Sequence, residues 1–175
     1  GNQCATVTNT WIYDFEPPTM PTVSGGPGKT NEVVVTTELD FGYVANAVDD
    51  YTRVTYHWLT NGVVVAENPT NFVGSVAEGT NTVEVYATDE ADNVSGTNAV
   101  VWVVDRTPPT LLGWSGLPEK FTTATDLSMT ATASDNLTRV TYHWTFDTDK
   151  EERTEDGEAF VRTGLADGEH TVKVY

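Results

Sequence analysis

The chain has 175 residues, of which 38% are hydrophobic and 20% are charged. This composition supports a packed core and argues against disorder. Acidic residues outnumber basic ones by 26 to 9, and the formal net charge of −17 repels nucleic acid and anionic lipid. No apolar run reaches the roughly 18 residues that a membrane span needs. We therefore expect no nucleic-acid partner and no membrane insertion.

The acidic balance and the single cysteine both bear on how the chain is stabilised. Cys4 has no partner for an intrachain disulfide. The acids are either a solvated surface that resists aggregation or ligands for a hard cation such as calcium. Composition alone leaves both readings open.

The predicted elements are short strands separated by turn residues. The first strand signal lies over residues 5–14, and further strands are predicted over residues 20–24, 32–38, 42–48, 52–59, 62–67, 71–76, 81–88 and 98–104. Asn61-Gly62 lies between two apolar runs, and both residues tolerate the positive φ of a two-residue hairpin turn. No segment carries a helical period of useful length. The pattern predicts an all-β sandwich.

Internal repeats predict tandem modules. Residues 49–58 recur at 135–144, residues 79–86 recur at 168–175, and the surroundings of Asp14 match those of Asp105. The matches divide the chain into three parts: residues 1–16, the last strand of a preceding module and a linker; residues 17–106, a complete module; and residues 107–175, a module truncated before its last strand.

This division predicts an open edge on the second module. Residues 5–14 of a neighbouring copy would fit that gap, and repeating the contact head-to-tail would build a fibre. In the alternative, residues outside 1–175 complete each module on its own chain. The sequence leaves both alternatives open.

Alternation along the strands identifies the core. Val54, Tyr56 and Trp58 share one face of their strand, residues 140, 142 and 144 repeat them, and residues 83, 85 and 87 face them from a later strand. A buried tryptophan on the third strand of the sandwich is typical of immunoglobulin-like domains. The predicted fold is all-β, with tandem immunoglobulin-like β-sandwich modules of which the second lacks its last strand.

Several segments carry a family resemblance. Residues 87–93, 105–110, 133–136 and 164–171 resemble the bacterial and archaeal Ig-like repeat domains of surface adhesins, surface-layer proteins and secreted polysaccharide-degrading enzymes. The resemblance covers nearly the whole chain. It implies an extracellular or cell-surface setting and a role in spacing and presenting other domains, in many cases stiffened by calcium.

The acids gather in three places that an immunoglobulin-like topology brings to one end of the sandwich. Calcium binds six to eight oxygens, which carboxylates from several loops can supply. The candidate ligands are Asp14, Glu16, Asp49, Asp50, Asp89, Asp92 and Asn93. The alternative is that these loop acids are simply solvated. A weaker second site is expected around Asp105, Asp135 and Asn136, because Arg106 and Thr107 depart from the first pattern and the last loop is absent.

Nothing in the sequence supports catalysis. His57, His143 and His170 are far apart along the chain, and no nucleophile elbow, phosphate-binding loop or two-histidine metal motif is present. Trp11, Trp102 and Trp114 are candidates for a sugar-stacking platform. Because Trp11 and Trp102 are repeat equivalents in the final strand, we interpret them as sandwich packing instead.

The chain is thus predicted to be a non-catalytic extracellular spacer or adhesive array. Its expected partners are neighbouring Ig-like modules or head-to-tail copies of itself, with surface glycans or proteins as further candidates. The alternative is an accessory, glycan-binding or spacer module of a secreted polysaccharide-degrading enzyme.

Overall fold

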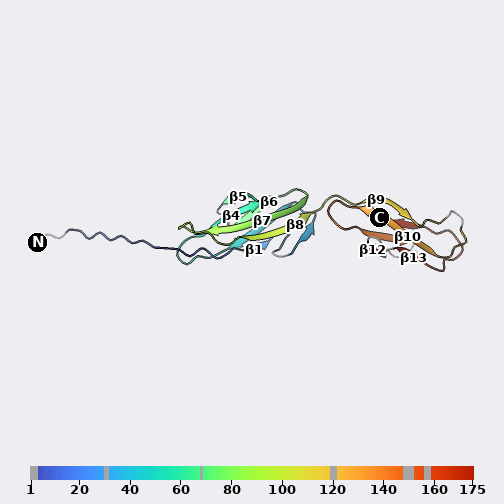
Figure 1. Ribbon diagram of the computed structural model, residues 1–175, viewed down its shortest axis with the longest axis horizontal. Coiled ribbons are helices and arrows are strands. Elements are labelled where there is room, and N and C mark those ends of the chain that lie inside the picture. The colour runs from blue at the N-terminus through green and yellow to red at the C-terminus, as the bar shows by residue number, and fades with distance from the viewer. Residues whose placement is uncertain (1–3, 30–31, 68, 119–121, 148–151, 156–158) are drawn as a thin grey trace. The chain divides into compact units, whose positions relative to one another are not determined.

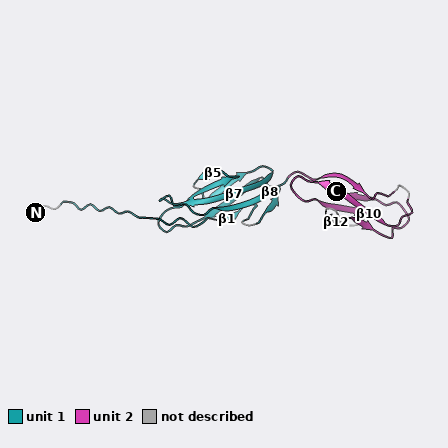
Figure 2. Ribbon diagram, viewed as in Figure 1, with its two compact units in different colours: residues 1–105 teal, residues 106–175 magenta. Residues whose placement is uncertain are grey.

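The computed structural model describes residues 4–29, 32–67, 69–118, 122–147, 152–155 and 159–175. The chain divides into two compact units, unit 1 (Gly1–Asp105) and unit 2 (Arg106–Tyr175), which Figure 2 shows in different colours. All regular elements among the described residues are strands (Figure 1). A search of the same residues finds no helix long and apolar enough to cross a membrane.

Unit 1 contains two sheets. The three-stranded sheet has the order β1 (Thr22–Gly25), β3 (Asp40–Asn46), β6 (Asn71–Ser75). The five-stranded sheet has the order β2 (Val34–Thr36), β8 (Asn98–Val104), β7 (Gly79–Thr88), β4 (Thr55–Thr60), β5 (Val63–Glu67). Among the described strands of unit 1, the β2–β8 pair is parallel and the other pairs are antiparallel.

The two sheets pack face to face because each presents one apolar side. Along β3 and β7, buried residues alternate with less buried ones, as expected for strands with one face in a core. The rings of Trp58 on β4 and Phe72 on β6 stack with centroids 5.2 Å apart, and Trp102 on β8 meets Phe41 on β3 at 5.4 Å. These contacts join the sheets, so unit 1 is a β-sandwich. The burial predicted for Tyr56, Trp58, Val83, Val85 and Ala87 is confirmed.

Unit 2 repeats this plan with fewer strands. One sheet has the order β13 (Phe160–Arg162), β10 (Leu127–Ser134), β9 (Thr110–Ser115), and the other has the order β12 (Glu152–Glu155), β11 (Thr141–Phe146), β14 (Val172–Val174). Trp144 on β11 is fully buried and stacks on Phe160 of β13 with centroids 5.1 Å apart. Among the described residues of unit 2, no strand corresponds to β2 or β8 of unit 1.

A shared tyrosine contact shows that the units are repeats in three dimensions. The Tyr56 hydroxyl accepts a hydrogen bond from the Ala47 backbone N–H at 2.8 Å, and the Tyr142 hydroxyl accepts one from the Ala133 N–H at the same distance. The hydroxyls satisfy backbone donors that would otherwise lack partners at the edge of the core. The sequence offset between the tyrosines is 86 residues.

The segment before the first strand of unit 1 lies outside both sheets of that unit. Residues 4–16 form no strand, and the side chain of Trp11 is 65% exposed, whereas its repeat equivalent Trp102 is fully buried. The expected sandwich packing is confirmed for Trp102. The assignment of residues 5–14, and with them Trp11, to the last strand of a preceding module stays a prediction.

Candidate cation site at one end of unit 1

Three aspartates from distant parts of the chain converge at one end of unit 1. Asp14 lies before β1, Asp49 lies in the β3–β4 loop, and Asp89 directly follows β7. One carboxylate oxygen of each lies within 4.8 Å of the others. The topology causes this convergence, because the β3–β4 and β7–β8 loops leave the sandwich at the same end.

Asp49 is held by the turn that it caps. Its Oδ1 accepts hydrogen bonds from the Tyr51 N–H (3.0 Å), the Thr52 N–H (2.9 Å) and the Thr52 hydroxyl (3.2 Å). These donors, the backbone N–H of Thr52 first, lower the pKa of Asp49 below its usual value. The carboxylate is therefore ionised and fixed, and Oδ2 has no hydrogen-bond partner among the described residues although it is buried.

Asp89 is the most buried member, with 5% of its surface exposed. Its Oδ1 accepts the N–H groups of Ala91 (2.8 Å) and Asn93 (2.9 Å). The Asn93 carboxamide donates to its Oδ2 at 2.8 Å. These bonds orient the carboxylate towards the other two.

Asn93 also fastens the N-terminal segment to the site. Its Nδ2 donates to the backbone carbonyls of Asp14 (3.3 Å) and Glu16 (3.5 Å). A few residues on, the Thr19 N–H donates to the Val48 carbonyl and the Val48 N–H donates to the Thr19 hydroxyl, at 2.9 and 3.0 Å. Asp14 is thus positioned by contacts from both loops.

The electrostatics of the cluster favour a cation. Burial raises the pKa of Asp14, the charges of Asp49, Asp89 and Asp50 raise it further, and the Glu16 N–H opposes the shift. Asp14 Oδ2 and Asp49 Oδ2 are both buried, and neither has a hydrogen-bond partner in the described part of the chain. Within the described part of the chain no lysine or arginine forms an ion pair with any of the three carboxylates. Buried oxygens of like charge without donors are costly unless something positive lies between them.

The other predicted ligands lie outside this cluster. Glu16 contributes its backbone groups and its side chain is exposed. Asp50 is exposed and acts on Asp14 through its charge. Asp92 is exposed and adopts a φ of 64°, which forms the turn that returns the chain to Asn93.

Sequence reasoning missed two contributors. Thr52 fixes Asp49 with its backbone and its hydroxyl, and the main-chain carbonyls of residues 14 and 16 face Asn93. The sequence carries a signal for Thr52, because the turn at residues 49–52 recurs at residues 135–138 with an aspartate first and a threonine last. In the repeated turn, Asp135 accepts hydrogen bonds from the Leu137 N–H (2.9 Å) and the Thr138 N–H (2.8 Å). No sequence pattern identifies the carbonyls.

The weaker second site remains a prediction. Asp105 closes unit 1, whereas Asp135 and Asn136 belong to unit 2. Asp135 accepts hydrogen bonds from the backbone of its own turn in unit 2, as Asp49 does in unit 1.

The strand order and register place both units in the class of immunoglobulin-like β-sandwiches. No model of a protein family matches the chain, and a search of curated proteins finds no match. Among solved structures, the chain is similar to fibronectin(III)-like modules of Clostridium thermocellum CbhA, with 24% identity over 47% of this chain and 96% of theirs, and a TM-score of 0.39. It is also similar to the central fibronectin-III array of RIM-binding protein, with 13% identity over 86% of this chain and 62% of that one, and a TM-score of 0.34.

Proposed function

We propose that the chain is a non-catalytic spacer of an extracellular or cell-surface protein, stiffened by calcium bound at Asp14, Asp49 and Asp89. The observation that carries the proposal is the convergence of these three carboxylates, two of which have a buried oxygen without a hydrogen-bond partner among the described residues. A divalent cation would neutralise the repulsion and supply the missing partner.

The donor set favours calcium over other divalent ions. All three candidate ligand atoms that converge are carboxylate oxygens. Zinc and copper prefer nitrogen and sulfur, and magnesium demands a tighter octahedron than loops of different origin readily provide. Calcium tolerates irregular oxygen shells.

The site lies where stiffening matters mechanically. Asp14 is separated by two residues from Pro17-Pro18, whose fixed φ already restricts the connection into unit 1. A cation shared with Asp49 and Asp89 would tie the segment before the prolines to two loops of the sandwich. The expected effect is a rigid joint in place of a swivel.

The histidines support a non-catalytic role, because each has a structural contact. His57 stacks on Tyr86 with centroids 4.6 Å apart, and its repeat equivalent His143 stacks on Tyr175 at 5.4 Å. His170 pairs with Asp147. The Nε2 of His57 also lies 2.9 Å from the hydroxyl of Thr88, a neighbour on the paired strand β7.

A single substitution with a matched control tests the proposal. In Asp14→Asn the backbone contacts remain, but one negative charge leaves the cluster. In chelator, the variant should melt at the same temperature as the parent or higher, because the raised pKa of Asp14 means that its ionisation disfavours folding at neutral pH. In calcium the order should reverse: the parent gains about 2.7 kcal/mol at 100 times the dissociation constant, and the variant gains little.

Asp92→Asn is the control, because it makes the same chemical change at the same end of unit 1 but outside the cluster, and asparagine tolerates the positive φ there. It should respond to calcium as the parent does. A parent whose melting temperature ignores calcium, and which shows no calcium binding in titration calorimetry, would rule out the proposal.

A second candidate, an accessory module that binds glycans, has one observation in its favour. Trp114 on β9 is 43% exposed and adjoins a cavity of unit 2, as sugar-stacking aromatics do. Micromolar binding on a glycan array that is lost in Trp114→Ala would favour this function over the spacer.

A further inference from the structure

The turn between β4 and β5 contains the one asparagine of the sequence that is followed by glycine, Asn61. Such a pair is prone to deamidation, because glycine has no side chain to shield its backbone nitrogen from the asparagine carboxamide. Both residues are exposed, and a Cβ added at Gly62 would meet nothing within 4 Å. The turn therefore leaves room for the Gly62 nitrogen to attack the Asn61 side chain.

The same turn restrains that side chain. The Asn61 Oδ1 accepts the Thr82 N–H at 2.8 Å, and the Asn61 Nδ2 donates to the Asn81 Oδ1 at 3.2 Å. We call these two contacts the clamp. Attack by the Gly62 nitrogen turns the carboxamide towards Gly62 and away from β7, so it breaks the clamp. The clamp therefore slows the reaction in the folded chain.

The contact with Asn81 requires an amide at position 61. Asn81 is 3% exposed, and its Nδ2 donates to the carbonyls of Ala77 (2.9 Å) and Gly79 (3.0 Å), which uses both of its hydrogens. Its Oδ1 is thus the atom that faces Asn61, and it accepts from the Asn61 Nδ2. A carboxylate at position 61 accepts hydrogen bonds and donates none. It would remove the donor of a buried oxygen and set two acceptors against each other.

Unit 2 has a carboxylate at the equivalent position, because the repeat offset of 86 residues relates Asn61 to Asp147. The Asp147 Oδ1 accepts the Thr171 N–H at 2.7 Å, and Asn61 accepts the Thr82 N–H in the same way. The Asp147 Oδ2 lies 2.9 Å from the Nδ1 of His170, which donates to it when the ring is protonated. The turn therefore accommodates an acid where a donor lies opposite.

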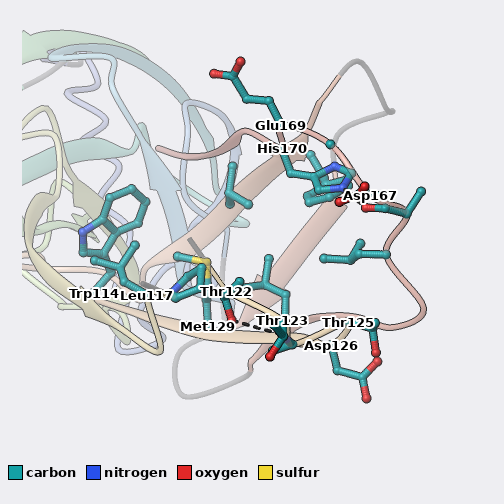
Figure 3. A pocket seen from close by; sticks show the side chains of 18 residues that line it. Trp114, Leu117, Thr122, Thr123, Thr125, Asp126, Met129, Asp167, Glu169 and His170 are labelled. Carbon is teal, nitrogen blue, oxygen red and sulfur yellow. Dashed lines mark hydrogen bonds between the residues drawn. The ribbon is translucent and has the colours of Figure 1, made fainter. Parts of the chain in front are cut away.

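His170 is the counterpart of Asn81. Its Nε2 lies 2.9 Å from the Ala166 carbonyl, as the Asn81 Nδ2 lies 2.9 Å from the Ala77 carbonyl. Figure 3 shows His170 among the side chains that line a pocket of unit 2. Unit 1 has no such donor at this place, since Asn81 has already committed both of its hydrogens to carbonyls.

We propose that Asn61 is a deamidation site, that the clamp slows the reaction, and that the acid it produces destabilises unit 1. The deprotonated Gly62 nitrogen attacks the Asn61 Cγ, the new N–Cγ bond closes a succinimide ring, and the Cγ–Nδ2 bond breaks as Nδ2 takes up a proton and leaves as ammonia. Water then adds to either ring carbonyl and opens the ring to aspartate or isoaspartate. Nothing is oxidised or reduced, and a neutral amide becomes a carboxylate.

Peptide mass spectrometry during incubation of the whole chain at mildly alkaline pH measures the reaction at each asparagine. Asn61 should convert ahead of the other asparagines, and faster as the pH rises, because the attacking nitrogen must lose its proton. Gly62→Ala should slow the conversion, because a methyl group then shields that nitrogen.

Asn81→Ala tests the clamp, because it removes the side-chain contact with Asn61. It should speed the conversion at least several-fold. Gly26→Ala is the matched control: it strains unit 1 at another turn, where a Cβ would lie 2.1 Å from the Tyr43 ring, and it leaves the clamp intact. It should speed the conversion far less. Equal rates in the two variants, or an Asn61 that stays intact while other asparagines convert, would overturn the proposal.

Asn61→Asp supplies the product without the reaction. It should lower the melting temperature of unit 1 by about 5 °C or more, because the buried Asn81 oxygen loses its donor. Combining Asn61→Asp with Asn81→His rebuilds the pair of unit 2 and should recover most of the loss below the pKa of the introduced histidine and less above it. If Asn61→Asp melts with the parent, the acid does not destabilise unit 1 and the proposal is wrong.

Discussion

At the scale of single residues, the two units use different chemistry at one equivalent position. Asn61 and Asp147 both adopt a positive φ, 50° and 51°, at the end of equivalent strands. Each accepts a backbone N–H from across the sheet, from Thr82 at 2.8 Å and from Thr171 at 2.7 Å. Asn61 then donates to Asn81, whereas Asp147 binds His170 at 2.9 Å. An amide pair in unit 1 is thus an ion pair in unit 2.

This ion pair predicts a pH dependence of unit 2. His170 has an acceptor at each ring nitrogen, the Ala166 carbonyl and Asp147, both at 2.9 Å, and only the protonated ring donates to both. These contacts, the Ala166 carbonyl first, raise the pKa of His170 above 6.5, and the hydrogen bond from His170 is the main cause that lowers the pKa of Asp147 below 3.8.

The stabilisation from His170 is complete below pH 6.5 and is lost as the pH rises through the raised pKa of His170. The stabilisation from Asp147 is complete above pH 3.8 and is lost as the pH falls through the lowered pKa of Asp147. Chemical denaturation of the parent and of His170→Asn should therefore differ most between these limits and converge above the pKa of His170. A difference independent of pH would contradict this account.

At the scale of elements, the turns determine which glycines are replaceable. Gly26, between β1 and β2, has a φ of 64°, and a Cβ there would lie 2.1 Å from the Tyr43 ring. Gly62 in the β4–β5 hairpin has a φ of 77°, but a Cβ there would meet nothing within 4 Å. The two sites share the backbone strain and differ in the steric clash.

Gly62→Ala should cost about 1–2 kcal/mol, the strain of a left-handed residue. Gly26→Ala should cost about 1–3 kcal/mol more, because the core tyrosine must move. Urea denaturation of both variants measures the difference. Equal losses would mean that Tyr43 moves aside freely and that the β1–β2 turn does not constrain the core.

At the scale of the whole molecule, each unit has its own hydrophobic core. Separate cores allow separate unfolding, and all three carboxylates of the proposed calcium site lie in unit 1. Scanning calorimetry should show two transitions, of which calcium raises only that of unit 1, by about 10 °C or more if binding adds about 2.7 kcal/mol. Equal shifts of both transitions would place a bound ion elsewhere.

The sequence by itself determined the repeated sandwich and most of its core. Alternation at residues 54–58 and 83–87 predicts which side chains are buried, because in a strand the period of two decides the face. The spacing of the loops predicts that acids near residues 14, 49 and 89 share one end. These are local or topological properties, and they follow from a pattern along the chain.

Only the tertiary structure decided which of those acids meet and which tryptophan is buried. Asp49 and Asp89 are oriented by turns whose hydrogen bonds fix one carboxylate oxygen of each. Glu16 is held through its backbone carbonyl by Asn93, and its side chain is exposed. Asp92 forms a turn with a positive φ, and its side chain is exposed too. Trp11 and Trp102 have matching neighbours in sequence, yet one is exposed and the other buried. A strand needs a partner edge and a side chain needs a facing sheet, and neither is encoded in the segment itself.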